Sequence, residues 1–308
     1  MSMQEFPTDA HGIIYRRTAL DHGYTDKQLA KDVRGRDLMR IWQGAFIPTP
    51  PKPLKPHELH RLRALAAATL GDESVLSHES AALVHGLSLL HPRLDRLHFA
   101  TGLKTGGRVD QNRHLHAGVL TAEDVTSLER VTVTTLERTA ADVACTQGFA
   151  VALAVLDSAL RRGADPDLIA THLERHRRGV AQARRALTLA DAGAENAGES
   201  WGRAQIIAAG LPIPRLQHKF FDRDGEFVAR TDYDWRGALA AEFDGMVKYQ
   251  RHLREGESAF DAMKREKLRE DALRRLGVMV IRWIWDDLRH NRVVPMVREW
   301  LNTLGLSA

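Results

Sequence analysis

Four carboxylates lie close together in the C-terminal third of the sequence. Asp232 and Asp234 precede an apolar run that contains one arginine, and Glu242 and Asp244 follow it. The pattern predicts a hairpin with acids at both ends. Burying a charge without a partner is costly, which leaves two interpretations. The acids lie on a solvated strand end, where they pair with Arg230, Arg236 and Lys248, or they surround a cation.

The spacing of these acids favours a divalent metal site. Glu242 and Asp244 are two residues apart and therefore point to the same face of a strand, while Asp232 ends the preceding strand. Such carboxylates bind Mg²⁺ or Mn²⁺ through oxygen, and the ion would polarise a phosphate and acidify its bound water. We predict Asp232, Glu242 and Asp244 as metal ligands. Glu199 is a candidate fourth acid, and Lys248 could orient the nucleophile or neutralise the phosphate.

The elements that must position these acids are predicted over residues 191–308. A helix precedes a three-stranded meander that turns at Asp224-Gly225, and a long charged helix, a further strand and a last helix follow. We expect the further strand to run through VMVIRWIWDDL, with Trp283 and Trp285 on one face. The predicted order is α-β-β-β-α-β-α, which makes this an α/β region.

A second candidate site lies within residues 11–49. A short helix ends at Gly23, a second helix begins with Thr25 and Gln28 at capping-box spacing, and a hairpin surrounds Gln43-Gly44. This is the order of a winged helix-turn-helix, whose second helix enters the major groove of DNA. The basic residues expected to contact DNA are Lys27, Lys31, Arg34, Arg36 and Arg40. The alternative is an ordinary exposed helix face, because Asp26, Asp32 and Asp37 dilute the charge.

The overall composition is that of an ordinary globular protein, with 308 residues and a net charge of +4. A single cysteine, Cys145, excludes an internal disulfide and a cysteine zinc cluster. We expect a soluble, cytoplasmic protein, because no secretory signal and no run long enough to cross a membrane is found. Among the 15 histidines, His114 and His116 alternate on a strand, but no third ligand has a convincing spacing, so structural or surface roles are expected.

Two families resemble parts of the chain. The N-terminal region, with the pattern RxxAL…G…QL…G…R…G-x-(Phe/Tyr) and the run HESAALVHGL, is similar to the winged-helix antitoxin of the abortive-infection AbiE system. The C-terminal region resembles actinobacterial proteins related to very-short-patch-repair endonucleases. The matching residues are Glu199-Ser200-x-x-Arg203, Gly210-Leu211-Pro212, Gln217, Arg230-x-Asp232-Tyr233, Glu242-Phe243-Asp244-Gly245-x-x-Lys248-Tyr249 and Arg282.

The resemblance implies a restriction-endonuclease-like fold with Asp232 and Glu242 as metal-binding acids. Asp244 stands where the wider class has a lysine, and Lys248 is the nearest lysine that could replace it. We therefore expect an endonuclease that hydrolyses double-stranded DNA with Mg²⁺ or Mn²⁺. The alternative is a non-catalytic, antitoxin-like regulator that binds operator DNA and a toxin partner or a second copy of itself.

The chain is expected to be a multi-domain α/β protein. Five prolines within residues 48–56 predict a stiff linker. We predict a winged helix-turn-helix over 1–50, a middle α/β domain with a helical tail over 57–190 and a restriction-endonuclease-like α/β domain over 191–308.

Overall fold

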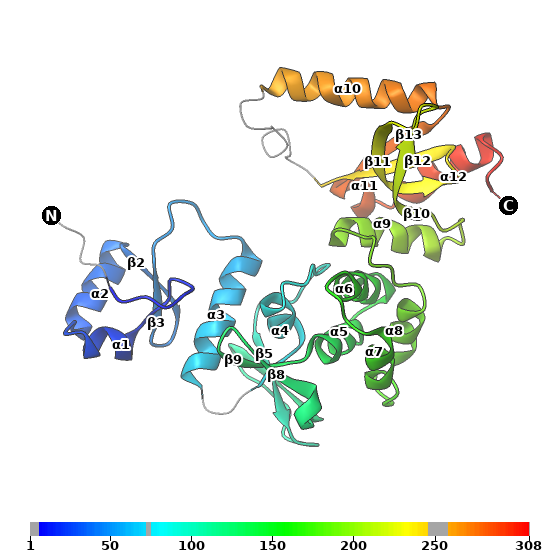
Figure 1. The fold of residues 1–308 in the computed structure, drawn as a ribbon. Helices are drawn as coiled ribbons and strands as arrows, with labels where there is room; N and C mark the ends of the chain where they lie inside the picture. Colours follow the sequence, from blue (N-terminus) through cyan, green and yellow to red (C-terminus); the bar gives the residue numbers. More distant parts are fainter. Residues whose placement is uncertain (1–5, 72–74, 246–257, 308) are drawn as a thin grey trace. The chain divides into compact units, whose positions relative to one another are not determined.

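The computed structural model describes residues 6–71, 75–245 and 258–307 (Figure 1). This part of the chain is a mixed α/β structure with three sheets. It divides into two compact units: Met1–Leu87 with His91–Val143 form unit 1, and Ser88–Leu90 with Ala144–Ala308 form unit 2. None of its helices combines the length and the hydropathy that crossing a bilayer requires.

Unit 1 begins with the predicted helix, helix, hairpin order. Thr25 and Gln28 form the predicted capping box, since the Gln28 N–H donates to Thr25 Oγ1 at 3.3 Å and Gln28 Oε1 accepts from the Thr25 N–H at 2.8 Å. The hairpin turns at Gly44, whose φ of 76° is easy only for glycine. The elements are β1 (Ile14–Tyr15), α1 (Arg16–Asp21), α2 (Asp26–Gly35), β2 (Leu38–Trp42) and β3 (Ala45–Pro48), with the strand order β1-β3-β2.

The remainder of unit 1 is a six-stranded mixed sheet with the strand order β6-β7-β5-β4-β9-β8. Its strands are β4 (Val75–Leu76), β5 (Leu97–Gly102), β6 (Arg108–Val109), β7 (Arg113–Val119), β8 (Val125–Leu128) and β9 (Val131–Thr134). Its helices are α3 (Pro56–Leu70), α4 (His78–Val84) and α5 (Leu136–Ala144).

The predicted linker at 48–56 lies inside unit 1. Ile41 and Ile47 of the N-terminal hairpin share one core with Leu65 of α3 and Phe99 of β5. The boundary between the two compact units therefore does not fall at the proline-rich segment, because apolar side chains from both sides of the prolines are buried in one core. The three domains of the sequence analysis stay predictions.

Unit 2 contains a helical segment followed by the predicted α-β-β-β-α-β-α order, with one additional short helix after the last strand. The helical segment is α6 (Phe149–Arg161), α7 (Pro166–His172) and α8 (Val180–Leu187). The following elements are α9 (Ala197–Ala208), β10 (Arg215–Phe221), β11 (Phe227–Trp235), β12 (Leu239–Asp244), α10 (Ala259–Arg275), β13 (Met279–Ile284), α11 (Trp285–Arg289) and α12 (Val293–Thr303). Strands β10, β11 and β12 form an antiparallel meander, and β13 pairs parallel to β12.

The prediction for the last strand was wrong at its C-terminal end. Strand β13 stops at Ile284, and Trp285 begins α11, so Trp283 and Trp285 do not share a strand face. The Asp287 carboxylate accepts the Ile284 N–H at 2.9 Å and so begins the helix. Trp283 is buried in the core, and the Trp285 ring packs edge-on against Phe243.

The two faces of the unit 2 sheet are covered by different helices (Figure 1). On one face Phe243 and Trp283 pack with Ile206 of α9 and with α12. On the other face Ala240 packs with Leu273 of α10. Because side chains alternate along a strand, Glu242 lies on the α10 face of β12.

Candidate active site

Glu199 is held in the first turn of α9. Asn196 caps this helix, since its Oδ1 accepts the N–H groups of Gly198 at 2.9 Å and of Glu199 at 3.0 Å. The Glu199 carboxylate accepts the Glu195 N–H at 2.7 Å through Oε2 and the Asn196 amide through Oε1. The side chain is buried, with 3% exposure. These contacts place the carboxylate firmly beside the sheet.

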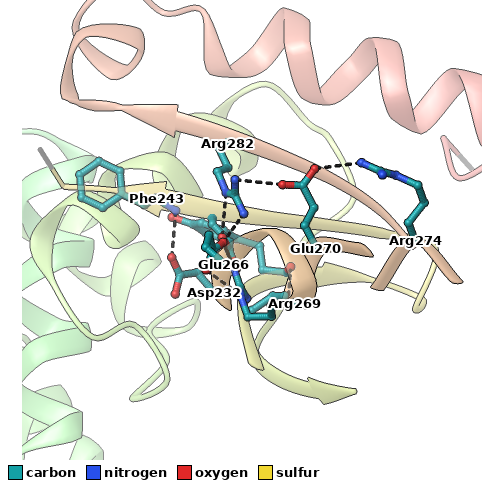
Figure 2. A network of polar contacts seen from close by, with 10 residues as sticks. Asp232, Phe243, Glu266, Arg269, Glu270, Arg274 and Arg282 are labelled. Carbon is teal, nitrogen blue, oxygen red and sulfur yellow. Dashed lines mark hydrogen bonds and ion pairs between the residues drawn. The ribbon is translucent and has the colours of Figure 1, made fainter. Parts of the chain in front are cut away.

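Gln217 of β10 joins Glu199 to Asp232 of β11. Its Nε2 donates to Asp232 Oδ1 at 3.3 Å and to Glu199 Oε2 at 3.4 Å. The other Asp232 oxygen accepts the Phe243 N–H at 2.8 Å, as Figure 2 shows. Gln217 has a φ of 52°, a backbone conformation that non-glycine residues seldom adopt and that is concentrated at functional sites. The structure thus pairs two carboxylates that lie 33 residues apart in the printed sequence.

The electrostatics of this pair are unusual. Burial, together with the negative charge of Asp232, raises the pKa of Glu199 from 4.5 to about 8. Burial also raises the pKa of Asp232, to which the charge of Glu242 contributes, while the Phe243 N–H acts in the opposite direction. Two buried carboxylates this close cannot both ionise readily without a compensating cation.

Glu242 has different partners. Arg269 of α10 contacts its Oε1 at 2.6 Å, and Arg282, opposite it in the parallel ladder of β12 and β13, contacts its Oε2 at 3.0 Å. Both arginines also contact Glu266, and Arg282 reaches Glu270 (Figure 2). The charge of Glu242 is therefore already compensated within the protein.

The remaining acids of the opening stretch lie elsewhere. Asp234 is buried and structural: it accepts the Gly237 N–H at 2.8 Å in the hairpin turn and the Arg215 Nε–H at 2.8 Å. Asp244 is exposed at the end of β12. Lys248 lies outside the described residues. The structure therefore brings Asp232 together with Glu199, while arginines hold Glu242, the second of the three predicted ligands.

A buried ion pair that the sequence analysis missed holds α9 in place. Asp157 of α6 contacts Arg203 Nη1 at 3.0 Å through both oxygens, and it also accepts the Ser200 hydroxyl at 2.8 Å. The Asp191 N–H donates to it at 2.8 Å. A lone acid in the apolar run FAVALAVLDSALR was the signal that could have identified Asp157.

Gly198 allows α9 to approach β12 closely. A Cβ added at Gly198 would lie 2.1 Å from Cε1 of Phe243, so no larger residue fits without displacing the ring. Phe243 also supplies the N–H that holds Asp232. The glycine and the Asp157 ion pair together position Glu199 against the sheet.

The predicted DNA-contacting residues of unit 1 are all exposed. Lys27, Lys31 and Arg34 are spaced by four and three residues and therefore share a face of α2. Arg36 ends the helix with a φ of 65°, and Arg40 on β2 lies over the Phe46 ring at 5.5 Å. Asp26, one of the acids that reduce the positive charge of α2, forms an ion pair with Arg16 at 2.6 Å. Its negative charge therefore offsets the charges of Lys27, Lys31 and Arg34 less than the sequence suggests.

The raised pKa of Glu199 predicts a specific dependence of stability on pH. A carboxyl whose pKa is higher in the folded state binds its proton more tightly there. Its stabilising contribution is full below about pH 4.5 and is lost as the pH rises through about 8. Without divalent metal, we expect the free energy of unfolding of the wild type relative to Glu199→Gln to fall across this window, by at most about 1.4 kcal/mol per pH unit. Urea denaturation at a series of pH values measures the difference.

The control is the exposed variant Glu226→Gln, which should leave the dependence of the free energy of unfolding on pH unchanged. Parallel pH dependences for Glu199→Gln and the wild type would contradict the prediction.

No protein-family model matches the chain. The fold and the site define a mixed α/β protein with a pair of coupled, buried carboxylates. The chain belongs to the same family as two proteins of Mycobacterium tuberculosis, "Uncharacterized protein MT2308" from strain CDC 1551 / Oshkosh and "Uncharacterized protein Rv2248" from strain ATCC 25618 / H37Rv. Each is 32% identical over 276 residues, which cover 86% of this chain and 92% of the relative. Among solved structures, the crystal structure of RV2827C protein from Mycobacterium tuberculosis matches 70% of this chain and 84% of its own, with 14% identity and a TM-score of 0.38.

Proposed function

We propose that this protein binds double-stranded DNA through a winged helix within residues 1–50 and hydrolyses its phosphodiester bonds in a restriction-endonuclease-like domain over residues 191–308. The observation that carries the proposal is the coupled pair of Glu199 and Asp232, joined by Gln217 at one edge of the sheet. Perturbed carboxylates of this kind are concentrated at catalytic sites. The resemblance to very-short-patch-repair endonucleases supports the same function.

The residues present fit a hard divalent cation. Glu199 and Asp232 offer carboxylate oxygens. Oε1 of Gln217 is buried without a hydrogen-bonding partner among the described residues, and a turn of the amide would bring it to the position that Nε2 holds beside the two carboxylates. Oxygen donors are the ligands that Mg²⁺ prefers, and a bound Mg²⁺ would polarise a phosphate and acidify its water. With a pKa of about 8, Glu199 can also hold or release a proton near neutral pH, so it could serve as an acid or a base in the reaction.

Incubation of the purified protein with supercoiled plasmid tests this function. Nicking in the presence of Mg²⁺ or Mn²⁺, and its absence in a chelated control, is the expected result. Plasmid binding without nicking under all metal conditions would contradict the nuclease and favour the regulator described below.

The DNA-binding half of the proposal predicts a loss of affinity in Lys27→Ala/Lys31→Ala/Arg34→Ala. Each lysine or arginine that neutralises a phosphate releases counterions, and each contact contributes about 0.9 to the slope of log affinity against log salt. We therefore expect the triple variant to bind duplex DNA more weakly and with a slope reduced by up to about 2.7. Fluorescence anisotropy over a range of salt concentrations measures both quantities.

A matched control removes the same number of charges from exposed positions on other elements of the chain. The control substitutions are Lys104→Ala, Arg108→Ala and Arg298→Ala. The result to exclude is a control that loses as much DNA affinity, and as much of the slope of log affinity against log salt, as the α2 variant. In that case DNA binding depends only on the net charge, and the winged helix is not the DNA-binding element.

A second candidate function is a non-catalytic regulator that binds operator DNA together with a toxin partner or a second copy of the chain. Two observations favour it: Glu242 is compensated by Arg269 and Arg282, and Asp244 stands where related nucleases have lysine. Footprinting distinguishes this function, because a symmetric regulator protects two half-sites about one DNA turn apart.

A further inference from the structure

Three histidines of the six-stranded sheet in unit 1 meet on one face. Strands β5 and β7 pair in parallel, with His98 opposite His114 and Ala100 opposite His116. Their candidate ligand nitrogens all lie within 4.8 Å of one another, and His98 Nδ1 is 2.9 Å from His116 Nε2. Spacing along the sequence gives no third partner for His114 and His116, because His98 belongs to a strand that is adjacent only in the folded sheet.

A buried carboxylate adjoins the histidines. Glu79 of α4 is 1% exposed, and neither of its oxygens has a hydrogen-bonding partner among the described residues. Its Oε2 lies 3.5 Å from His98 Nδ1. Burying a carboxylate with its hydrogen bonds unmade is costly unless a positive charge is nearby. Two hydrogen bonds nevertheless fix the start of α4, which carries Glu79, against His98. The Ser77 N–H donates to the His98 carbonyl at 3.0 Å, and the His98 N–H donates to Ser80 Oγ at 2.8 Å.

We propose that His98, His114 and His116 form a binding site for one divalent transition-metal ion of the Zn²⁺ type, with the Glu79 carboxylate beside His98 to compensate the charge. Three imidazoles are a donor set that Zn²⁺ and neighbouring first-row ions use. Bonds of about 2.0–2.1 Å to a tetrahedral ion place the ligand atoms roughly 3.3 Å apart. The His98 Nδ1 to His116 Nε2 distance of 2.9 Å and the limit of 4.8 Å for all three ligand nitrogens lie on either side of that value, so binding would require only small shifts of the rings.

A further feature lies beside the three histidines. His78 stacks on the His116 ring, with 3.6 Å between the centroids, and has a strained φ of 47°. The site is separate from the Glu199 and Asp232 pair, and its nitrogen donors select a different class of ion.

Calorimetry with ZnCl₂ tests the site on the full-length, untagged protein after dialysis against a chelator. We expect one equivalent of Zn²⁺ to bind and to raise the melting temperature. Co²⁺ in its place should give the visible absorption bands of a tetrahedral nitrogen and oxygen site. Absence of Zn²⁺ binding to the wild type would overturn the proposal.

Variants locate the site. His114→Ala/His116→Ala should abolish stoichiometric binding, while the exposed control His57→Ala should bind as the wild type does. Glu79→Gln keeps the shape of the buried side chain and should weaken binding at least about tenfold, the lower limit seen when a group that merely supports a ligand is lost. Circular dichroism shows whether each variant folds. If the double variant does not fold, the Zn²⁺ affinity of Glu79→Gln tests the site instead. A folded variant that binds Zn²⁺ as tightly as the wild type would refute the role given to the residues replaced in it.

Discussion

We expect Asp232→Asn and Glu199→Gln each to abolish Mg²⁺-dependent nicking of supercoiled plasmid, and neither to weaken binding to duplex DNA. Each change removes one of the two carboxylates that share Gln217. The loss should exceed the roughly 10- to 100-fold decrease that follows removal of a group that only orients a ligand. DNA affinity should be retained or increased, because a negative charge near phosphate is removed. Nicking rates at saturating metal and DNA anisotropy measure the two effects separately.

The matched controls for this prediction are Asp224→Asn and Glu226→Gln in the exposed turn between β10 and β11. They make the same changes of charge in the same unit and should leave nicking unchanged. Nicking that survives in Asp232→Asn would refute the assignment. Calorimetry that detects no Mg²⁺ binding to the wild type, with or without DNA, would also refute it and favour the regulator.

We expect Asp157→Ala to lower the free energy of unfolding by about 3–5 kcal/mol, the range for removal of one partner of a buried ion pair. The Arg203 side chain, 4% exposed, would lose its counterion, and Ser200 and the Asp191 N–H would lose an acceptor. Urea denaturation measures the loss. The exposed control Asp224→Ala should change stability by no more than about 0.5 kcal/mol.

The double variant Asp157→Leu/Arg203→Met distinguishes the cost of leaving Arg203 without its counterion from the contribution of the ion pair itself. Because it removes both charges and replaces them with apolar side chains, it should lose less stability than Asp157→Ala alone. A loss below about 1 kcal/mol in Asp157→Ala would mean that Arg203 finds another partner, and α9 would then not depend on this ion pair.

Short-range patterns in the sequence predicted the local structure well. The Thr25 and Gln28 capping box forms as its spacing indicates, and the hairpin between Asp232 and Glu242 has the predicted antiparallel pairing. These features depend on contacts within a few residues, so the residue types at fixed offsets suffice. The error at Trp285 has a local cause as well: an apolar run reads as a continuing strand unless the cap formed by Asp287 is recognised.

The site was predicted only in part. Glu199 and Asp232 were both identified, but the three-acid set of Asp232, Glu242 and Asp244 assumed that neighbouring acids share one ion. Two arginines compensate Glu242 instead, one from α10 and one from β13. Alternation along the strand correctly places Glu242 and Asp244 on one face, yet it cannot show which helix covers that face or which charges that helix carries.

The sequence by itself determined the two hairpins, the order α-β-β-β-α-β-α apart from the short helix α11, and the identity of the candidate acids. Tertiary structure alone decided which of these side chains meet. Gln217 reaches both Glu199 and Asp232, Asp157 meets Arg203 across 46 residues, and His98 joins His114 through the parallel pairing of β5 and β7. Parallel strands and packed helices bring together residues that no short sequence window contains, because their register is set by burial of the apolar faces rather than by the connecting turn.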